Sequence, residues 1–202
     1  MRDPPAFLAA LRPSPFASIT PPQVIGLGIL LGAMRVRRWP LAFAAYGLAT
    51  AAHETGRTMQ PVREQGGEAW LKSMYDIDGD RPRKALELGN DAPGDGVRYA
   101  GRGYVRFAGR SNYEKAGETL GIDLAGQPDL ALDPGEAAHI LVLGMAKGWF
   151  TGRRLANFLP ASGPATFDMF RRARRVVSGT DRDEEIALLA LRFQDALRAG
   201  GW

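Results

Sequence analysis

Apolar residues recur at three- and four-residue spacing through most of this sequence, and this periodicity constrains the fold more than any other feature. Such a spacing places apolar side chains on one face of a helix. It occurs in eight segments: 6–11, 22–35, 39–53, 67–74, 110–120, 134–147, 164–177 and 181–198. Strand-like alternation is confined to residues 97–109, where we expect a short β-hairpin. The sequence therefore predicts a mainly α-helical fold, and its 202 residues suit a single domain over 1–202.

The residue types available for chemistry are limited. The chain has no cysteine, which excludes disulfides, thiolate nucleophiles and zinc–thiolate sites. Its two histidines, His53 and His139, are too few for a histidine-rich metal centre. We therefore expect no metal and no other cofactor, and a chemistry based on carboxylates, hydroxyls and amides.

One apolar run near the N-terminus, residues 24–34, raises the question of a membrane or export signal. It has about half of the roughly 20 residues that are needed to span a bilayer. Because Pro21 and Pro22 precede it and proline suits a first helical turn, we expect a core helix there. The order of residues also differs from that of a signal peptide. We expect neither a signal peptide nor stable membrane insertion.

Charge gives a weak indication of partners. The net charge of +4 favours anionic partners such as the bacterial cell wall, although such a balance also serves solubility. Residues 170–179 include four arginines, but acidic residues follow at 181–185. A solvated helix face explains this pattern better than a nucleic-acid site does. We read segment 181–198 as an amphipathic helix that packs on the core.

Two glutamates are candidates for acid–base chemistry. Glu54 ends the apolar, alanine-rich segment 39–53, and Glu64 follows in a loop between Pro61 and Gly66. Burial raises the pKa of a carboxyl group, which suits a general acid, while an ionised partner can activate water. A carboxylic acid paired with a carboxylate in this way is the machinery of glycoside hydrolysis. The position of Glu54, taken alone, favours a solvated residue at a helix end over a catalytic acid. Glu68 could replace Glu64.

The segment 99–113 combines glycines with tyrosines. Its glycines allow a bound chain to approach the backbone, and its aromatic and polar side chains can contact sugars. The alternative is a glycine-bent hairpin whose tyrosines belong to the core.

Several motifs in this order resemble glycoside hydrolase family 19, which includes plant-type chitinases and phage endolysins. They are "AYGLATAAHETG", "PVRE", "LELGNDAPGDGVRYAGRGYV" and "GRSNY". Segments 121–159 and 173–182 resemble the phage and prophage branch, and the resemblance covers residues 40–198. It implies a lysozyme-like α-helical domain with a small β-hairpin, a loop-lined sugar-binding cleft and an inverting mechanism.

The resemblance also implies roles for individual residues. Glu54 falls on the family's general acid and Glu64 on the base that activates water. His53 would orient the site, although a structural histidine is as good an interpretation. The substrate contacts that the resemblance implies are Tyr99, Arg102, Asn112 and Tyr113.

Three positions depart from the family pattern. Arg106 stands where the family usually has glutamine, Ala108 where it has serine or threonine, and Ser178 where it has a sugar-binding asparagine. Arg106 could meet the lactyl or peptide carboxylates of peptidoglycan, which chitin lacks. Ser178 would still border the sugar. The loss of a hydroxyl at Ala108 could instead weaken catalysis.

These observations together predict an endolysin that cleaves the β-1,4 bonds between N-acetylmuramic acid and N-acetylglucosamine in peptidoglycan. The alternatives are a chitinase acting on poly-N-acetylglucosamine and a catalytically silent protein that binds the cell wall or belongs to a virion. We expect a monomer, made in the host cytoplasm, that acts at the periplasmic wall after release.

Overall fold

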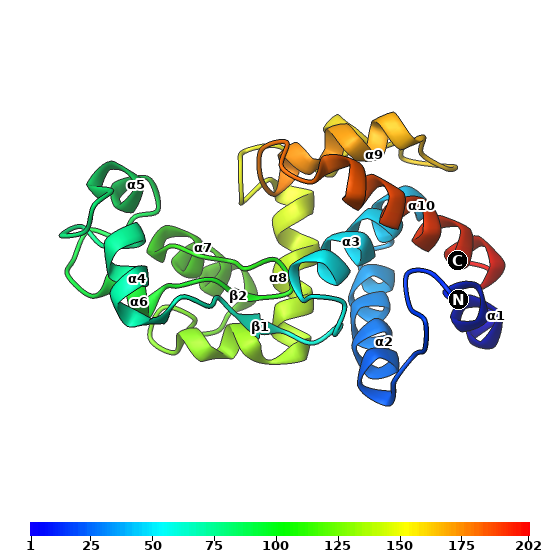
Figure 1. Cartoon of the computed structure of the whole chain (residues 1–202), viewed down its shortest axis with the longest axis horizontal. Helices are drawn as coiled ribbons and strands as arrows, with labels where there is room; N and C mark the ends of the chain where they lie inside the picture. Colours follow the sequence, from blue (N-terminus) through cyan, green and yellow to red (C-terminus); the bar gives the residue numbers. More distant parts are fainter. The chain divides into compact units, whose positions relative to one another are not determined.

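The computed structural model describes all 202 residues, and the chain forms two compact units. The terminal unit comprises Met1–Gln60 and Leu141–Trp202, and the central unit comprises Pro61–Ile140. The prediction of a mainly helical chain is confirmed, because helices make up nearly all the regular structure (Figure 1). No helix combines the length and the hydrophobicity that a bilayer-spanning segment needs.

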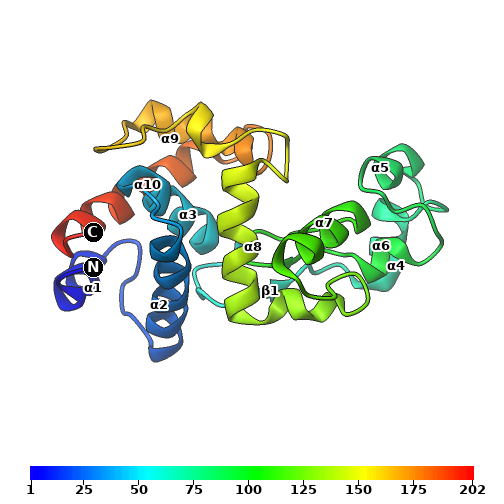
Figure 2. The ribbon, with the colours of Figure 1, turned by 180° about the vertical axis from the view of Figure 1, so that it is seen from behind.

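The terminal unit is built around α3 (Leu41–Glu54), which is buried along almost its whole length. α10 (Asp183–Ala199) lies along α3 and also packs on α9 (Phe167–Ala173) and α1 (Pro4–Ala10), as Figure 2 shows from behind. The alanines of α3 allow this close approach, and an all-round apolar helix is stable only when it is covered. The amphipathic C-terminal helix therefore packs on the core, as the sequence predicts.

α2 (Pro21–Val36) begins as its sequence indicates. Thr20 and Gln23 form a capping box, in which the Thr20 amide donates to Gln23 Oε1 at 2.8 Å, and the two prolines occupy the first turn. Leu27, Leu30 and Met34 are buried. The apolar run 24–34 is thus part of a core helix, as predicted.

The predicted helix over 164–177 is shorter and broken. α9 starts after the N-cap Thr166, whose Oγ1 accepts from the Met169 amide at 3.3 Å, and it ends at Ala173. A 3₁₀ turn, η3 (Arg174–Val176), continues the chain. Another 3₁₀ turn, η2 (Leu155–Asn157), follows α8 (Pro134–Lys147), the helix that leads from the central unit into the terminal unit.

The central unit has a two-stranded antiparallel sheet, β1 (Val62–Arg63) with β2 (Arg102–Gly103). The predicted hairpin is therefore only partly correct. Arg102 and Phe107 form a single bridge across the turn, but the partner strand of β2 is β1, which is too short to show alternation in the sequence. The helices of this unit are α4 (Gly67–Tyr75), α5 (Pro82–Glu87), α6 (Asp95–Arg98), α7 (Arg110–Leu120) and the turn η1 (Pro128–Leu132).

Candidate active site

Glu54 is the last residue of α3, and its side chain is 4% exposed. The guanidinium Nη1 of Arg174, in η3, lies 3.1 Å from Glu54 Oε1, and the Arg174 side chain is 5% exposed. Arg174 Nε also donates to the Asp181 carbonyl at 3.1 Å. Because a buried charge is costly unless it is paired, this ion pair stabilises both side chains in their buried positions. The pair fixes the carboxylate at the end of α3.

The chain turns sharply directly after Glu54. Gly56, Arg57 and Met59 all have positive φ, at 58°, 66° and 55°, a region that costs energy for residues with a side chain. Thr55 holds this turn, because its Oγ1 donates to the Ala51 carbonyl at 2.7 Å and accepts from the Met59 amide at 3.2 Å. This strain is confined to the turn, and it determines the direction in which the chain continues after Glu54, the candidate acid.

Helix α2 supports this turn from one side. Gln23 Nε2 donates to the Arg57 carbonyl at 2.9 Å, and Gln60 Nε2 donates to the Pro22 carbonyl at 2.6 Å. At Gly26 the helix is so close that a Cβ would collide with the Met59 carbonyl oxygen. Only glycine allows this approach.

His53 precedes Glu54 and lies with Nδ1 3.7 Å from Glu185 Oε1 of α10. Burial lowers the pKa of His53 below its usual value of 6.5, against the opposing effect of the Glu54 charge. The structure thus favours the neutral imidazole beside Glu54. Ser178 is exposed, and its amide donates to the Arg174 carbonyl at 3.0 Å. The fold therefore brings His53, Glu54 and the backbone of Ser178 to the same arginine.

Glu64 belongs to the central unit and is held at both carboxylate oxygens. The Tyr75 hydroxyl donates to Oε1 at 2.9 Å, and the Gly101 amide donates to Oε2 at 3.0 Å. The Glu64 amide in turn donates to the Gly101 carbonyl at 2.7 Å. A Cβ at Gly101 would lie 2.6 Å from Glu64 Oε2, so the hydrogen bond between the residue 101 amide and Glu64 requires glycine at this position. The result is a carboxylate with a fixed orientation.

Tyr75, at the end of α4, was not among the residues that the sequence indicates. Burial, and then the charge and hydrogen bond of Glu64, raise the pKa of Tyr75 to about 12, so that it stays a hydrogen-bond donor at neutral pH. The Trp70 ring stands edge-on to Tyr75 at 5.7 Å between centroids and is 39% exposed. Nothing in the sequence links Tyr75 with Glu64, because their contact depends on how α4 packs.

Arg102 and Tyr113 are buried within the central unit, at 4% and 0% exposure. Arg102 Nη1 donates to the Arg98 and Ala100 carbonyls and to the Tyr113 hydroxyl, at 2.9 to 3.0 Å. The Tyr113 hydroxyl donates to the Ala100 carbonyl at 2.9 Å. This bonding favours a structural role for both side chains over the substrate contact that the family resemblance implies.

Tyr99 and Asn112 also have contacts inside the protein. Tyr99 is 6% exposed and its hydroxyl donates to the Ala125 carbonyl at 3.3 Å. Its ring lies 5.4 Å from that of Tyr113. Asn112 Nδ2 donates to the Ala108 carbonyl at 2.8 Å. The tyrosines of this segment are therefore core residues, which was the alternative reading of the pattern.

Arg106 is the exposed cation of this segment. Its backbone has φ 48°. Arg106 lies close to Gly101: a Cβ added at Gly101 would lie 3.1 Å from the Arg106 carbonyl oxygen and 3.2 Å from the Arg106 Cβ. Its charge acts on Tyr75, where it lowers the pKa against the larger effects of burial and Glu64. Arg106 thus adds positive charge to the surroundings of Glu64.

No cluster of three or more His, Asp or Glu side chains is placed to hold a metal ion.

No family model matches the sequence. Among solved structures, chitinase C from Streptomyces griseus HUT6037 is similar with a TM-score of 0.60 and 18% identity, covering 97% of this chain and 75% of that one. A bacterial family 19 chitinase is similar with a TM-score of 0.55 and 25% identity, covering 86% of this chain and 85% of that one. The chain has the family 19 chitinase fold.

A sequence match agrees with the family 19 chitinase fold. Chitinase 8 of rice, Oryza sativa subsp. japonica, is 56% identical over 32 residues. This match spans 16% of the present chain and only 12% of the length of the rice protein. The structural and sequence matches together support a glycoside hydrolase, as the sequence predicts.

Proposed function

We propose that this protein hydrolyses β-1,4 bonds between N-acetylmuramic acid and N-acetylglucosamine in bacterial peptidoglycan, as an endolysin. In this proposal both units form one catalytic domain, and the protein acts as a monomer at the cell wall after release from the host cytoplasm. The observation that supports it most is that two glutamates have dedicated partners. Glu54 is paired with Arg174, and Glu64 is held at both oxygens by Tyr75 and Gly101.

The proposed reaction inverts the anomeric carbon. Glu54, which is a carboxylate in its ion pair with Arg174, must first take up a proton. It then gives this proton to the glycosidic oxygen, while ionised Glu64 takes a proton from a water that attacks from the opposite face. Arg174 then stabilises the carboxylate that Glu54 becomes. The two donors on Glu64 leave lone pairs for the water, since a carboxylate offers about four acceptor positions. The two glutamates lie in different units, and their assignment to one reaction rests on the order of the sequence motifs.

Arg106 favours peptidoglycan as the substrate. Peptidoglycan bears lactyl and peptide carboxylates, and chitin has none. An exposed guanidinium near Glu64 can form charge-assisted hydrogen bonds with such groups. The glutamine that the family resemblance implies at this position would give neutral hydrogen bonds only.

Two alternatives have their own support. A chitinase is favoured by the three similar proteins described above, each of which is a chitinase. A silent wall-binding or virion protein is favoured by Ala108 and Ser178, where groups that the family resemblance implies for water and sugar are missing.

Mass spectrometry of soluble fragments distinguishes these functions. Wild type, Glu54→Gln and Glu64→Gln would each be incubated with purified peptidoglycan and with chitin oligosaccharides. Glu68→Gln is the matched control, because Glu68 is an exposed residue of α4 that pairs with Lys72. We expect wild type and Glu68→Gln to release disaccharide peptides from peptidoglycan and the other two variants to release none.

Other results of this experiment would support the alternatives. Release from chitin alone would make the protein a chitinase. Binding of wild type to the wall without release of fragments would support the silent protein. Muramic acid at the reducing end identifies the bond that is cleaved, and the anomer formed first distinguishes inversion from retention.

A further inference from the structure

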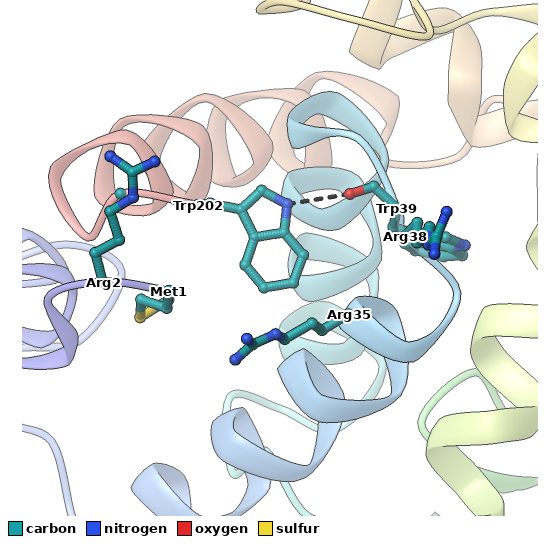
Figure 3. Close-up of a pocket in the computed structure, with 7 residues that line it drawn as sticks. Met1, Arg2, Arg35, Arg38, Trp39 and Trp202 are labelled. Carbon is teal, nitrogen blue, oxygen red and sulfur yellow. Dashed lines mark hydrogen bonds between the residues drawn. The ribbon is translucent and has the colours of Figure 1, made fainter.

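The terminal unit contains a pocket of about 540 Å³ with an unusual lining (Figure 3). It contains three arginines and two tryptophans, and no acidic side chain. Its full lining is Met1, Arg2, Arg35, Arg38, Trp39, Gly201 and Trp202. Its volume falls in the range of small-molecule sites, about 300 to 1,000 Å³. We call it the arginine–tryptophan pocket.

The pocket is held together by backbone hydrogen bonds. The Arg2 amide donates to the Gly200 carbonyl at 2.9 Å, and the Trp202 amide donates to the Leu197 carbonyl at 3.0 Å. The Trp202 indole Nε1 donates to the Trp39 carbonyl at 3.1 Å, as Figure 3 shows. Trp202 is thereby fixed between segments that are far apart in the sequence. The site is preorganised, which lowers the entropic cost of binding.

Trp39 closes the pocket on the side of α3. α2 ends at Val36, and Arg38 then adopts φ 52°, so that the Trp39 amide can donate to the Met34 carbonyl at 3.0 Å. Trp39 is 6% exposed, and a Cβ at Gly47 would lie 2.8 Å from its ring. Arg35 and Arg38 therefore lie on a rigid corner of the fold.

The charge of the pocket is not balanced by acidic side chains. Arg2, Arg35 and Arg38 are exposed, and none of them forms an ion pair with a carboxylate. The C-termini of α2 and α10 lie nearby, and a helix end contributes about half a negative charge. Two such ends offset about one of the three positive charges. The Met1 ammonium and the Trp202 carboxylate carry opposite charges, which offset each other. The remainder attracts an anion.

We propose that the arginine–tryptophan pocket binds an anionic saccharide, a sugar ring that bears a carboxylate or a phosphate. The planar guanidinium groups bind the anion, and the indole of Trp202 provides a flat apolar face for the sugar. α3 begins just after Trp39 and has Glu54 at its other end. Its 14 residues rise by ~1.5 Å each, so the pocket lies about 20 Å from Glu54. It is a second glycan site, separate from the proposed acid.

Nuclear magnetic resonance of the Trp202 indole N–H tests this proposal, because that group is bonded within the pocket. The protein used is Glu54→Gln, so that a failure of the proposed hydrolysis leaves the result unaffected. Trp202→Phe in the same background identifies the signal. The ligands are N-acetylmuramic acid, N-acetylglucosamine 6-phosphate, neutral N-acetylglucosamine and inorganic phosphate.

We expect one or both anionic sugars to shift the Trp202 signal with saturation. The neutral sugar and inorganic phosphate should bind about tenfold more weakly, because the neutral sugar lacks the anionic group and inorganic phosphate lacks the sugar ring. Arg2→Gln combined with Arg35→Gln should weaken binding at least as much. Arg37→Gln is the matched control, because Arg37 is an exposed neighbour outside the pocket.

The anionic sugar that binds more tightly shows whether the natural source is a muramic acid unit or a phosphorylated glycan. An unchanged Trp202 signal with both anionic sugars would overturn the proposal. Equal binding of the neutral sugar or of inorganic phosphate would overturn it as well, as would full binding by the double arginine variant.

Discussion

Arg174 and Glu54 form an ion pair at 3.1 Å in which both side chains are at most 5% exposed. The Arg174→Ala variant should lose about 3 kcal/mol of unfolding free energy, because it removes the guanidinium that is paired with the buried Glu54 carboxylate. Urea denaturation measures this loss. Arg175→Ala, which changes the exposed neighbour, should change stability by less than about 0.5 kcal/mol.

A double-mutant cycle separates this pairing from a general packing defect. Arg174→Ala should cost less in the Glu54→Gln background, because the neutral amide no longer needs a cation. If the two substitutions were additive within about 0.5 kcal/mol, the pair would have no coupling and the interpretation would be wrong.

His53 should make stability depend on pH. Burial lowers its pKa in the folded protein, whereas the unfolded chain binds the proton near pH 6.5. The contribution of neutral His53 is therefore complete above about pH 6.5 and is lost as pH falls toward the folded pKa. Histidine ring signals, assigned with His53→Gln, should titrate below pH 6.5. A midpoint at or above 6.5 would contradict this.

Gly101 should be essential for activity although it has no side chain. Gly101→Ala would displace Glu64, because a Cβ there lies 2.6 Å from Oε2. A displacement of about 1 Å in a catalytic group can cost about a hundredfold in rate, and we expect a loss of kcat of this size on the substrate that wild type cleaves. Gly32→Ala is the control, since nothing lies within 4 Å of a Cβ there. Equal kcat for both variants would show that Glu64 need not be fixed.

Arg106→Gln should shift substrate preference. Both residues tolerate φ 48° equally poorly, so the backbone cost cancels and the charge is the main difference. We expect the ratio of kcat/KM for peptidoglycan fragments to that for chitin oligosaccharides to fall about tenfold, as for the loss of one charge-assisted hydrogen bond. Arg81→Gln, another exposed arginine whose charge acts on Tyr75, should leave the ratio unchanged. A ratio that stays the same in Arg106→Gln would remove the argument for peptidoglycan.

Local signals made much of the fold predictable. The start of α8 is an example, because Pro134 follows Asp133, whose Oδ1 accepts from the Gly135 and Glu136 amides. α5 and α6 were missed, because each is too short to show periodicity. α5 lies within the glycine- and aspartate-rich segment 76–96, and α6 begins at the end of that segment.

The candidate site was predictable only in part. The two glutamates stand in recognisable motifs, whereas their partners depend on tertiary contacts. Arg174 is one of four similar arginines between residues 170 and 179, and only the packing of η3 distinguishes it. The same limit explains why Arg102 and Tyr113, which resemble substrate contacts in the sequence, are buried and bonded to each other.

Gly26 of α2 faces the Met59 carbonyl, in the strained turn that follows Glu54, with no room for a methyl group. Mutational tolerance along this helix should therefore vary within a single turn. In a library of random replacements selected for activity, replacements of Gly26 should be depleted almost as strongly as replacements of Glu54 and Glu64. Gly28 has open space around it and should accept alanine freely. Selection would then preserve Gly26 because any side chain at this position would collide with the Met59 carbonyl.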